Sequence, residues 1–217
     1  MSSLASEALP VFIKGLEATI FFSFGSVVIG FLMAVALCTM RLSKSVLLSS
    51  IAAVYVSFFR GIPLMVQLLI SFYCLPVIGI NVSPGASALF TMAACTAAYM
   101  AEILRGGFLG ISYGQIEAAQ ISGLSRFQIL KEIEVPQAVR LTLPSLINEV
   151  VNMVKASSLI SVVGVLDLTR AAQNVAASTY KPLSVYLTAG ILYLIVTSSI
   201  GALEAVAQKS LKAERQG

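Results

Sequence analysis

Residues 113–136 read YGQIEAAQISGLSRFQILKEIEVP, and this stretch decides how the whole chain is organised. It is a charged segment in the middle of a sequence that is otherwise strongly apolar. Ser112 and Gln115 have the spacing of a capping box, in which a hydroxyl and an amide satisfy the free backbone groups at a helix start. The same spacing recurs at Ser125 and Gln128. Two short helices in succession are therefore predicted.

The two predicted helices also have expected ends. Gly123 stands between them, where a left-handed glycine closes a helix, and Pro136 is expected to stop the second helix. Such a pair, held on one face of a bilayer, suits docking to a soluble partner. The apolar positions Phe127, Leu130 and Ile133 would equally suit a lipid surface, so an amphipathic loop lying on headgroups is the alternative.

The composition around this segment is that of a membrane protein. Of the 217 residues, 58% are hydrophobic and 11% are charged, and the mean hydropathy is +0.92. Soluble domains average about 25% charged and 45–50% apolar residues. So large an apolar excess must face lipid, which predicts an all-α integral membrane helical bundle. The length allows a single domain, residues 1–217, with no sizeable part outside the membrane.

Five apolar stretches are long enough to cross a bilayer, which takes about 20 residues each. They lie at about residues 18–40, 46–76, 85–105, 137–159 and 183–207. The second stretch is interrupted by Arg60-Gly61-Ile62-Pro63, because Pro63 frees a carbonyl in the preceding turn. This interruption predicts either a broken helix that lines a path or a kink that only improves packing.

The connections between these stretches differ in length and charge. Residues 106–136 form the connection that contains the two short helices. Residues 160–182 form the longest connection on the other side, and Asp167 to Gln173 is predicted to be a short surface helix within it.

The distribution of Lys and Arg predicts the orientation. Nine basic residues fall on one side, which should be the cytoplasm: Arg41, Lys44, Arg105, Arg126, Lys131, Arg140, Lys209, Lys212 and Arg215. Three fall on the opposite side: Lys14, Arg170 and Lys181. The N-terminus is therefore expected outside and the C-terminus inside.

Nothing in the sequence predicts catalysis, a metal site or a cofactor. The chain has no histidine, which removes the commonest general base and metal ligand. Cys38, Cys74 and Cys95 are isolated in apolar segments and lack metal-site spacing. No phosphate-binding loop, H-E-x-x-H or G-x-S-x-G motif is present. The basic residues are spread among loops, which argues against nucleic-acid binding.

Four charged residues lie at membrane depth: Arg60, Glu102, Glu149 and Lys155. Each costs roughly 2.5–3.5 kcal/mol at a helix centre, so such side chains usually face a cavity or a partner. Asn148, Asn152 and Lys155 share one helical stripe, and the Lys155 ammonium suits the carboxylate of an amino acid. The alternative is that Lys155 pairs with Glu149 or Glu102 and holds the bundle together.

Several motifs resemble a known family. Glu117-Ala118-Ala119, Gly123 and Val135-Pro136-Gln137-Ala138 resemble the EAA loop of bacterial ABC importer permeases. Three further strings resemble the polar amino acid subfamily, which carries histidine, arginine, glutamine or cystine: Arg60-Gly61-Ile62-Pro63-Leu64 with Gln67, AYMAEILRGG at 98–107, and Lys155-Ala156-Ser157-Ser158-Leu159. The resemblance covers roughly residues 10–210 and implies a type I ABC importer permease fold.

The resemblance also implies roles for individual residues. Six would couple the chain to an ATPase: Glu117, Ala118, Ala119, Gly123, Leu124 and Phe127. Seven would line the substrate path: Arg60, Gln67, Glu102, Asn152, Lys155, Ser157 and Ser158. Relatives usually have aspartate at the position of Ala156, so a substrate ammonium would need another carboxylate.

The implied partners are a second permease subunit, an ABC ATPase dimer that binds ATP and Mg²⁺, an extracytoplasmic binding protein, membrane lipid and a polar amino acid. The implied location is the bacterial inner membrane. A secondary transporter, which would carry its own coupling carboxylates, and a structural membrane subunit are the alternatives.

Overall fold

The computed structural model describes residues 2–213 of the chain, with side chains described for residues 8–203 and 205. Arg215, one of the nine basic residues counted on the cytoplasmic side, lies outside the described residues, as do the side chains of Lys209 and Lys212. The α-helices are α1 (Ser2–Arg41), α2 (Val46–Gly61), α3 (Leu64–Leu69), α4 (Pro84–Leu109), α5 (Tyr113–Ile121), α6 (Arg126–Ile129), α7 (Val135–Ala156), α8 (Leu168–Thr179) and α9 (Pro182–Ala213). Shorter π or 3-10 turns are η1 (Ile70–Cys74), η2 (Leu75–Ile78), η3 (Leu130–Glu134) and η4 (Ser157–Val163).

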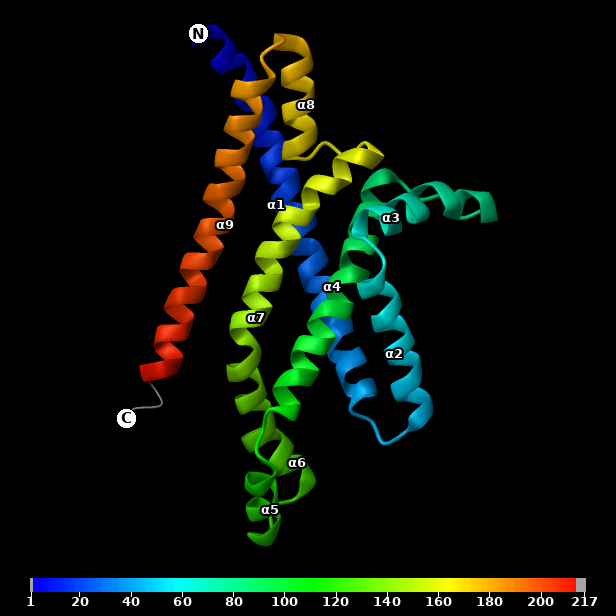
Figure 1. Ribbon diagram of the computed structural model, residues 1–217, viewed down its shortest axis with the longest axis vertical. Coiled ribbons are helices and arrows are strands. Elements are labelled where there is room, and N and C mark those ends of the chain that lie inside the picture. Colours follow the sequence, from blue (N-terminus) through cyan, green and yellow to red (C-terminus); the bar gives the residue numbers. More distant parts are fainter. Residues whose placement is uncertain (1, 214–217) are drawn as a thin grey trace.

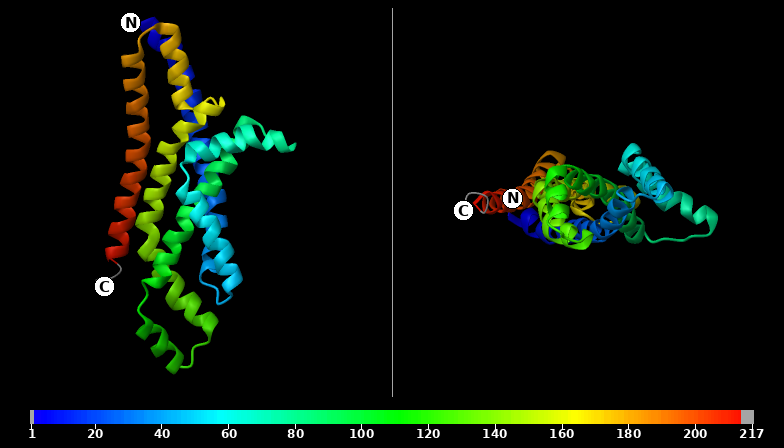
Figure 2. Two further views of the ribbon diagram at one scale, coloured as in Figure 1. Left: turned by 45° about the vertical axis from the view of Figure 1, so that its right-hand side comes forward. Right: turned by 90° about the horizontal axis from the view of Figure 1, so that it is seen from below.

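The chain runs up and down an elongated bundle. Helices α1, α4 and α7 lie side by side along the long axis, with α2 and α9 on opposite flanks (Figure 1). Helices α5 and α6 project at one end, and α8 lies at the other end beside the start of α1 (Figures 1 and 2). The predicted all-α membrane fold is confirmed. Within the described residues four helices are long and apolar enough to cross a membrane, or five if α2 and α3–η2 count as one broken span.

Small residues hold α1 against α4 along most of their length. A Cβ on Gly30 would lie 2.8 Å from the Ala93 carbonyl oxygen and 2.8 Å from Thr96 Cβ. Ala34, one turn further along, is fully buried. Membrane helices associate through close van der Waals packing of this kind, because lipid provides no hydrophobic driving force between them. The described part of α1 begins well before the predicted span at residue 18, so the membrane borders of this helix stay a prediction.

The core consists of three clusters along the long axis. The cluster at the α8 end joins α1, α8 and α9 around Phe12, Leu168 and Val185. The middle cluster joins α3, α4 and α7 around Leu68, Met92 and Met153. The third cluster lies towards the α5 end and joins α1, α2 and α4: Ala34, Cys38, Val56, Ala98, Met100, Ala101 and Leu104.

The second apolar stretch is broken where the sequence predicted an interruption. Helix α2 ends at Gly61, and the chain turns by 103° before α3 and its extension to Ile78. Pro63 is extended rather than helical, with φ −57° and ψ 137°. The resulting arm, α3 to η2, leaves the bundle sideways (Figure 1). A bend of this size is much larger than a packing kink.

The predicted helix pair in the 113–136 segment is present, but only one capping box forms. The Ser125 hydroxyl accepts from the Gln128 backbone N–H, and the Ser125 N–H donates to the Gln128 side chain. The box at Ser112 is wrong: its side chain caps nothing. Gln115 instead accepts a 2.7 Å hydrogen bond from the Gln137 amide, so a contact between segments replaced the local one.

Gly123 adopts the left-handed conformation that was predicted, with φ of 82°. The Leu124 N–H donates to the Ala119 carbonyl and the Gly123 N–H donates to the Gln120 carbonyl. These two bonds form a Schellman motif, which satisfies the free carbonyls at the end of α5.

The prediction that Pro136 stops the second helix is wrong. Helix α6, the π turn η3 and α7 follow one another without interruption, so a single helical run extends from Arg126 to Val163. The Val135 N–H reaches back five residues to the Leu130 carbonyl. Proline lacks an N–H and crowds the carbonyl four residues before it. A π turn at this point widens the helix, and Pro136 is accommodated at the second position of α7.

The outer connection contains the predicted short helix, α8, which exposes one face and packs the other face into the bundle. Asp167 accepts from the Thr169 and Arg170 N–H groups and so caps α8. Asp167 is fully buried, and burial raises its pKa, while these hydrogen bonds oppose the rise. Leu168, Ala171 and Ala172 are also fully buried, packed against α1 and α9. The alanines on one face of α8 allow this close packing. Because polar residues surround them in the sequence, the burial of this face was not predicted.

Candidate functional site

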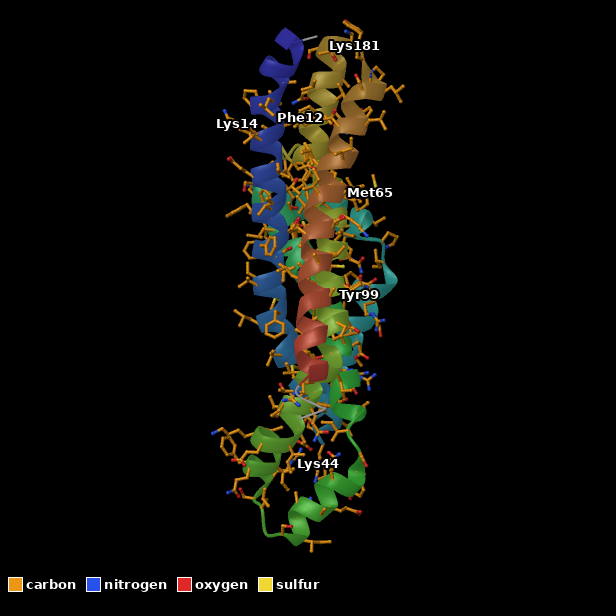
Figure 3. The ribbon with its side chains drawn as sticks, turned by 90° about the vertical axis from the view of Figure 1, so that its left-hand side faces the viewer. Phe12, Lys14, Lys44, Met65, Tyr99 and Lys181 are labelled. Carbon is orange, nitrogen blue, oxygen red and sulfur yellow. The ribbon has the colours of Figure 1, made fainter. Side chains whose placement is uncertain are left out.

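A pocket of about 430 Å³ lies where the broken helix faces α4 and α7. The break itself forms one wall and two helices of the bundle form the other. The lining residues are Arg60, Gly61, Ile62, Pro63, Leu64, Cys95, Tyr99, Glu149, Asn152, Met153 and Ala156. Tyr99 lies about midway along the bundle (Figure 3).

The polar groups of the pocket carry opposite charges. The Arg60 guanidinium carbon lies 5.3 Å from the centre of the Tyr99 ring, a cation–π contact. Glu149 is buried, and Asn152, which lies beside its carboxylate, lines the same pocket. Among the described residues that line this pocket, Arg60 carries the positive charge and Glu149 the negative charge.

Gln67 does not line the pocket but lies directly behind the break. Its Nε2 donates to the Phe59 carbonyl at 2.8 Å and to the Ile62 carbonyl at 2.7 Å. The Phe59 carbonyl is the one that Pro63 leaves without an intrahelical N–H. Gln67 is buried at 5% exposure, so its amide takes the place of the missing backbone donors.

Lys155 lies on the stripe predicted for α7. Asn148, Asn152 and Lys155 are all exposed along one face of this helix. Among the described side chains no ion pair involves Lys155, so the pairing of Lys155 with Glu149 or Glu102 is absent there.

The two serines that follow Lys155 turn back on their own helix. Ser157 is buried and donates to the Val154 carbonyl, while Ser158 donates to the Lys155 carbonyl. Neither is among the residues that line the pocket.

Glu102 lies apart from the pocket, in an ion cluster that joins α1 to α4. It accepts from Arg41 Nε at 3.1 Å and from Arg105 Nη2 at 2.7 Å. Arg41 is the last residue of α1, so the cluster lies towards the end that carries α5 and α6.

The residues predicted for coupling lie together at the projecting end. Glu117 and Ala118 are exposed, Ala119 is buried, and Leu124 is half-buried beside Gly123. Large apolar side chains are solvent-exposed there, among them Ile121 at 88% and Phe127 at 71%. Exposed apolar side chains gathered at one end of a molecule suit contact with a partner protein or with lipid.

A second ion pair stabilises this end. Arg126 Nη1 lies 2.7 Å from Glu134 Oε1, and Glu134 is buried. The pair spans η3, so it fixes α6 relative to the start of α7.

Sequence reasoning missed part of the pocket. Tyr99 belongs to a motif that was noticed, but nothing in it indicated a partner for Arg60. Glu149 was noticed as a charge at depth, although it was not counted among the path residues. Its spacing of three residues from Asn152, which places both side chains on one face of a helix, was the signal that could have identified it.

Comparison with known proteins finds similar transport system permease proteins. The nopaline transport system permease protein NocM of Agrobacterium fabrum is 36% identical over 215 residues, covering 94% of this chain and 89% of the relative. The octopine transport system permease protein OccM of Rhizobium meliloti is 35% identical over 224 residues, covering 97% and 89%.

Solved structures agree with this. A chain in the crystal structure of an amino acid ABC transporter with histidines superposes with a TM-score of 0.90 and 32% identity, covering 94% of this chain and 96% of that one. A chain of the inward-facing methionine ABC transporter MetNI has a TM-score of 0.77 at 19% identity, covering 94% and 97%, and this similarity shows the fold alone.

The family profile for the inner membrane component of binding-protein-dependent transport systems matches residues 26–212. This match decides against a secondary transporter and against a purely structural subunit. It also makes the chain a transport component of the inner membrane. The chain therefore belongs to the family of binding-protein-dependent inner membrane permeases, the membrane-spanning subunits of ABC importers.

Proposed function

We propose that the chain translocates a zwitterionic polar amino acid through the pocket beside the broken helix. The observation that carries this is the presence of one guanidinium, Arg60, and one buried carboxylate, Glu149, in the lining of one cavity. The volume of the cavity falls within the roughly 300–1,000 Å³ of small-molecule sites. The names of similar proteins support an amino acid or a related compound as the substrate: nopaline for NocM, octopine for OccM, and an amino acid ABC transporter with histidines.

In this proposal Arg60 receives the substrate carboxylate and Glu149 receives its ammonium. Ala156 contributes only a methyl group to the pocket wall. Glu149 then provides the negative charge that position 156 lacks. Asn152, which lies beside Glu149, would orient the carboxylate.

The exposed polar stripe of α7 would border the same path. Asn148, Asn152 and Lys155 would be costly against lipid, so this face suits a water-filled passage between two permease subunits. Lys155, on the same face as Asn152, would attract the substrate carboxylate as the amino acid enters or leaves the pocket.

Partners complete the transporter in this proposal. A second permease subunit, identical or homologous, would face the α7 stripe. Two ATPase subunits that bind ATP and Mg²⁺ would receive the exposed Ile121 and Phe127 side chains. An extracytoplasmic binding protein would deliver the amino acid at the α8 end. ATP binding would shift the pathway outward because the ATPase dimer binds the two permease arrangements with different affinity.

The test is uptake into proteoliposomes that contain the permease with its ATPase and binding protein. Glu149→Gln keeps the shape and removes the charge, and Arg60→Met removes the guanidinium. Each is expected to lower amino acid uptake roughly tenfold or more, while gel filtration shows an assembled complex and basal ATP hydrolysis continues. Glu17→Gln, at an exposed carboxylate of α1, is the matched control and should transport normally. Full uptake by both pocket variants would refute the proposal.

A further inference from the structure

We propose that Gln67 is a positioning residue: it fixes the wall of the pocket, and with it Arg60, by taking the place of the backbone donors that the helix break removes. This inference rests on the proposed function of the pocket. It differs from a substrate contact, because Gln67 is buried and is not among the lining residues.

The first step concerns the carbonyls at the break. A proline removes one backbone donor, and the 103° turn at this point separates the ends of α2 and α3. In the described hydrogen bonds the Phe59 carbonyl is approached by Gln67 Nε2 at 2.8 Å and by Cys95 Sγ at 3.9 Å. The donor side of this contact is shielded, because Gln67 is only 5% exposed, and a polar group left without a partner away from water is costly.

The second step concerns the orientation of the amide. Both neighbours of the Gln67 side chain are carbonyl oxygens, so only the NH₂ group can face them. Its two hydrogens meet Phe59 and Ile62, while Oε1 is buried without a partner. The side chain therefore tolerates an unsatisfied acceptor in order to donate twice, and a carboxylate or a thioether at this position could not donate at all.

The third step connects the break to the pocket. Arg60, Gly61, Ile62 and Pro63 all line the cavity, and the two carbonyls that Gln67 holds lie at the two ends of this short segment. Cys95, which contacts the Phe59 carbonyl, also lines the cavity from α4. Gln67 thus ties the end of α2 to α3 across the break, and this holds the backbone from which the Arg60 side chain reaches the Tyr99 ring.

The experiment uses the complete complex with its ATPase and binding protein. Gln67→Met keeps the length and removes both donors. It is expected to lower the maximal uptake rate on the order of tenfold without loss of assembly. Gln173→Met is the matched control, because the Gln173 amide only accepts from the exposed Arg170 on α8, and it should transport normally.

A double-mutant cycle separates positioning from direct contact. If Gln67 acts through Arg60, then Gln67→Met added to Arg60→Met should lower uptake by less than twofold further. A second full reduction, so that the two effects multiply, would overturn the proposal.

The reactivity of Cys95, which lines the pocket, tests whether the pocket wall moves and does not depend on transport. With Cys38→Ala and Cys74→Ala, Cys95 is the remaining thiol of this chain, and N-ethylmaleimide should modify it several-fold faster when Gln67→Met releases the wall, as measured on the separated permease subunit. Unchanged reactivity of Cys95 would overturn the proposal. So would a complex that falls apart on gel filtration, because Gln67 would then serve assembly. If the unmutated complex carries no amino acid but Cys95 still reacts faster, the positioning role stands and only the proposed function fails.

Discussion

Single residues set the geometry of this permease where the backbone has no regular partner. Gly123 closes α5 in a conformation that other residues rarely adopt, Asp167 caps α8 from within the core, and Gln67 compensates for Pro63. In each case one side chain, or its absence, satisfies backbone groups that a helix end leaves free. The direction of the next element depends on that residue.

Gly123→Val is expected to uncouple the permease without unfolding it. No atom lies within 4 Å of a Cβ at this position, so the cost is backbone strain alone, about 1–2 kcal/mol for a residue held left-handed. Helix α6 should then leave in a different direction, and stimulation of ATP hydrolysis by the loaded binding protein should fall. Gly123→Asn, which tolerates this conformation, should retain most stimulation. Normal stimulation in the valine variant would contradict the role of this turn.

At the scale of elements, the bundle depends on close approach between helices. Gly107 on α4 lies against α7, where an added Cβ would overlap Thr142 Cγ2 and lie 3.0 Å from the Ala138 carbonyl oxygen. Gly106, its neighbour in sequence, has no atom within 4 Å of such a Cβ. Two adjacent glycines therefore differ in what they do, although the sequence presents them alike.

Gly107→Ala is expected to destabilise the complex, and Gly106→Ala is expected to leave it unchanged or slightly more stable. Overpacking at a tight contact typically costs about 1–3 kcal/mol, whereas alanine in an open helical position favours the helix. Thermal denaturation in mild detergent, followed by gel filtration, measures both. Equal melting temperatures for the two variants would show that α4 and α7 are less closely packed than described.

The sequence predicted those elements whose signals are local. The Ser125 box, the Gly123 turn and the interruption before Pro63 each depend on a few neighbouring residues. Other features depend on distant partners and could not be predicted. The box at Ser112 was lost because Gln115 meets Gln137, and Gln67 could be assigned to its carbonyls only once the 103° turn was known.

At the scale of the whole molecule, the orientation in the membrane is still a prediction. Lys44 lies near the α5–α6 end and Lys181 at the opposite end of the long axis (Figure 3). The positive-inside count places Lys44 in the cytoplasm and Lys181 outside. Both side chains are exposed, so each can report its own side.

Cysteine labelling tests this orientation. In a chain with Cys74→Ala, which removes the exposed native thiol, Lys181→Cys should react with a membrane-impermeant maleimide in intact cells. Lys44→Cys should react only after the membrane is permeabilised. If both positions label from the same side, one of the three predicted spans between them does not cross, and the α2–α3 pair would be the first to reconsider.

The uninterrupted helix from Arg126 to Val163 has a thermodynamic consequence. It carries Phe127 at one end and Glu149 further along, roughly 33 Å apart at 1.5 Å per residue. In the proposed function, the ATPase contacts the helix at Phe127, and the amino acid binds at Glu149. Linkage then requires a symmetry: if nucleotide on the ATPase weakens the hold on the amino acid by some factor, the amino acid must weaken nucleotide binding by the same factor. An amino acid bound in the membrane pocket would thus change the affinity of the ATPase for nucleotide on the cytoplasmic side.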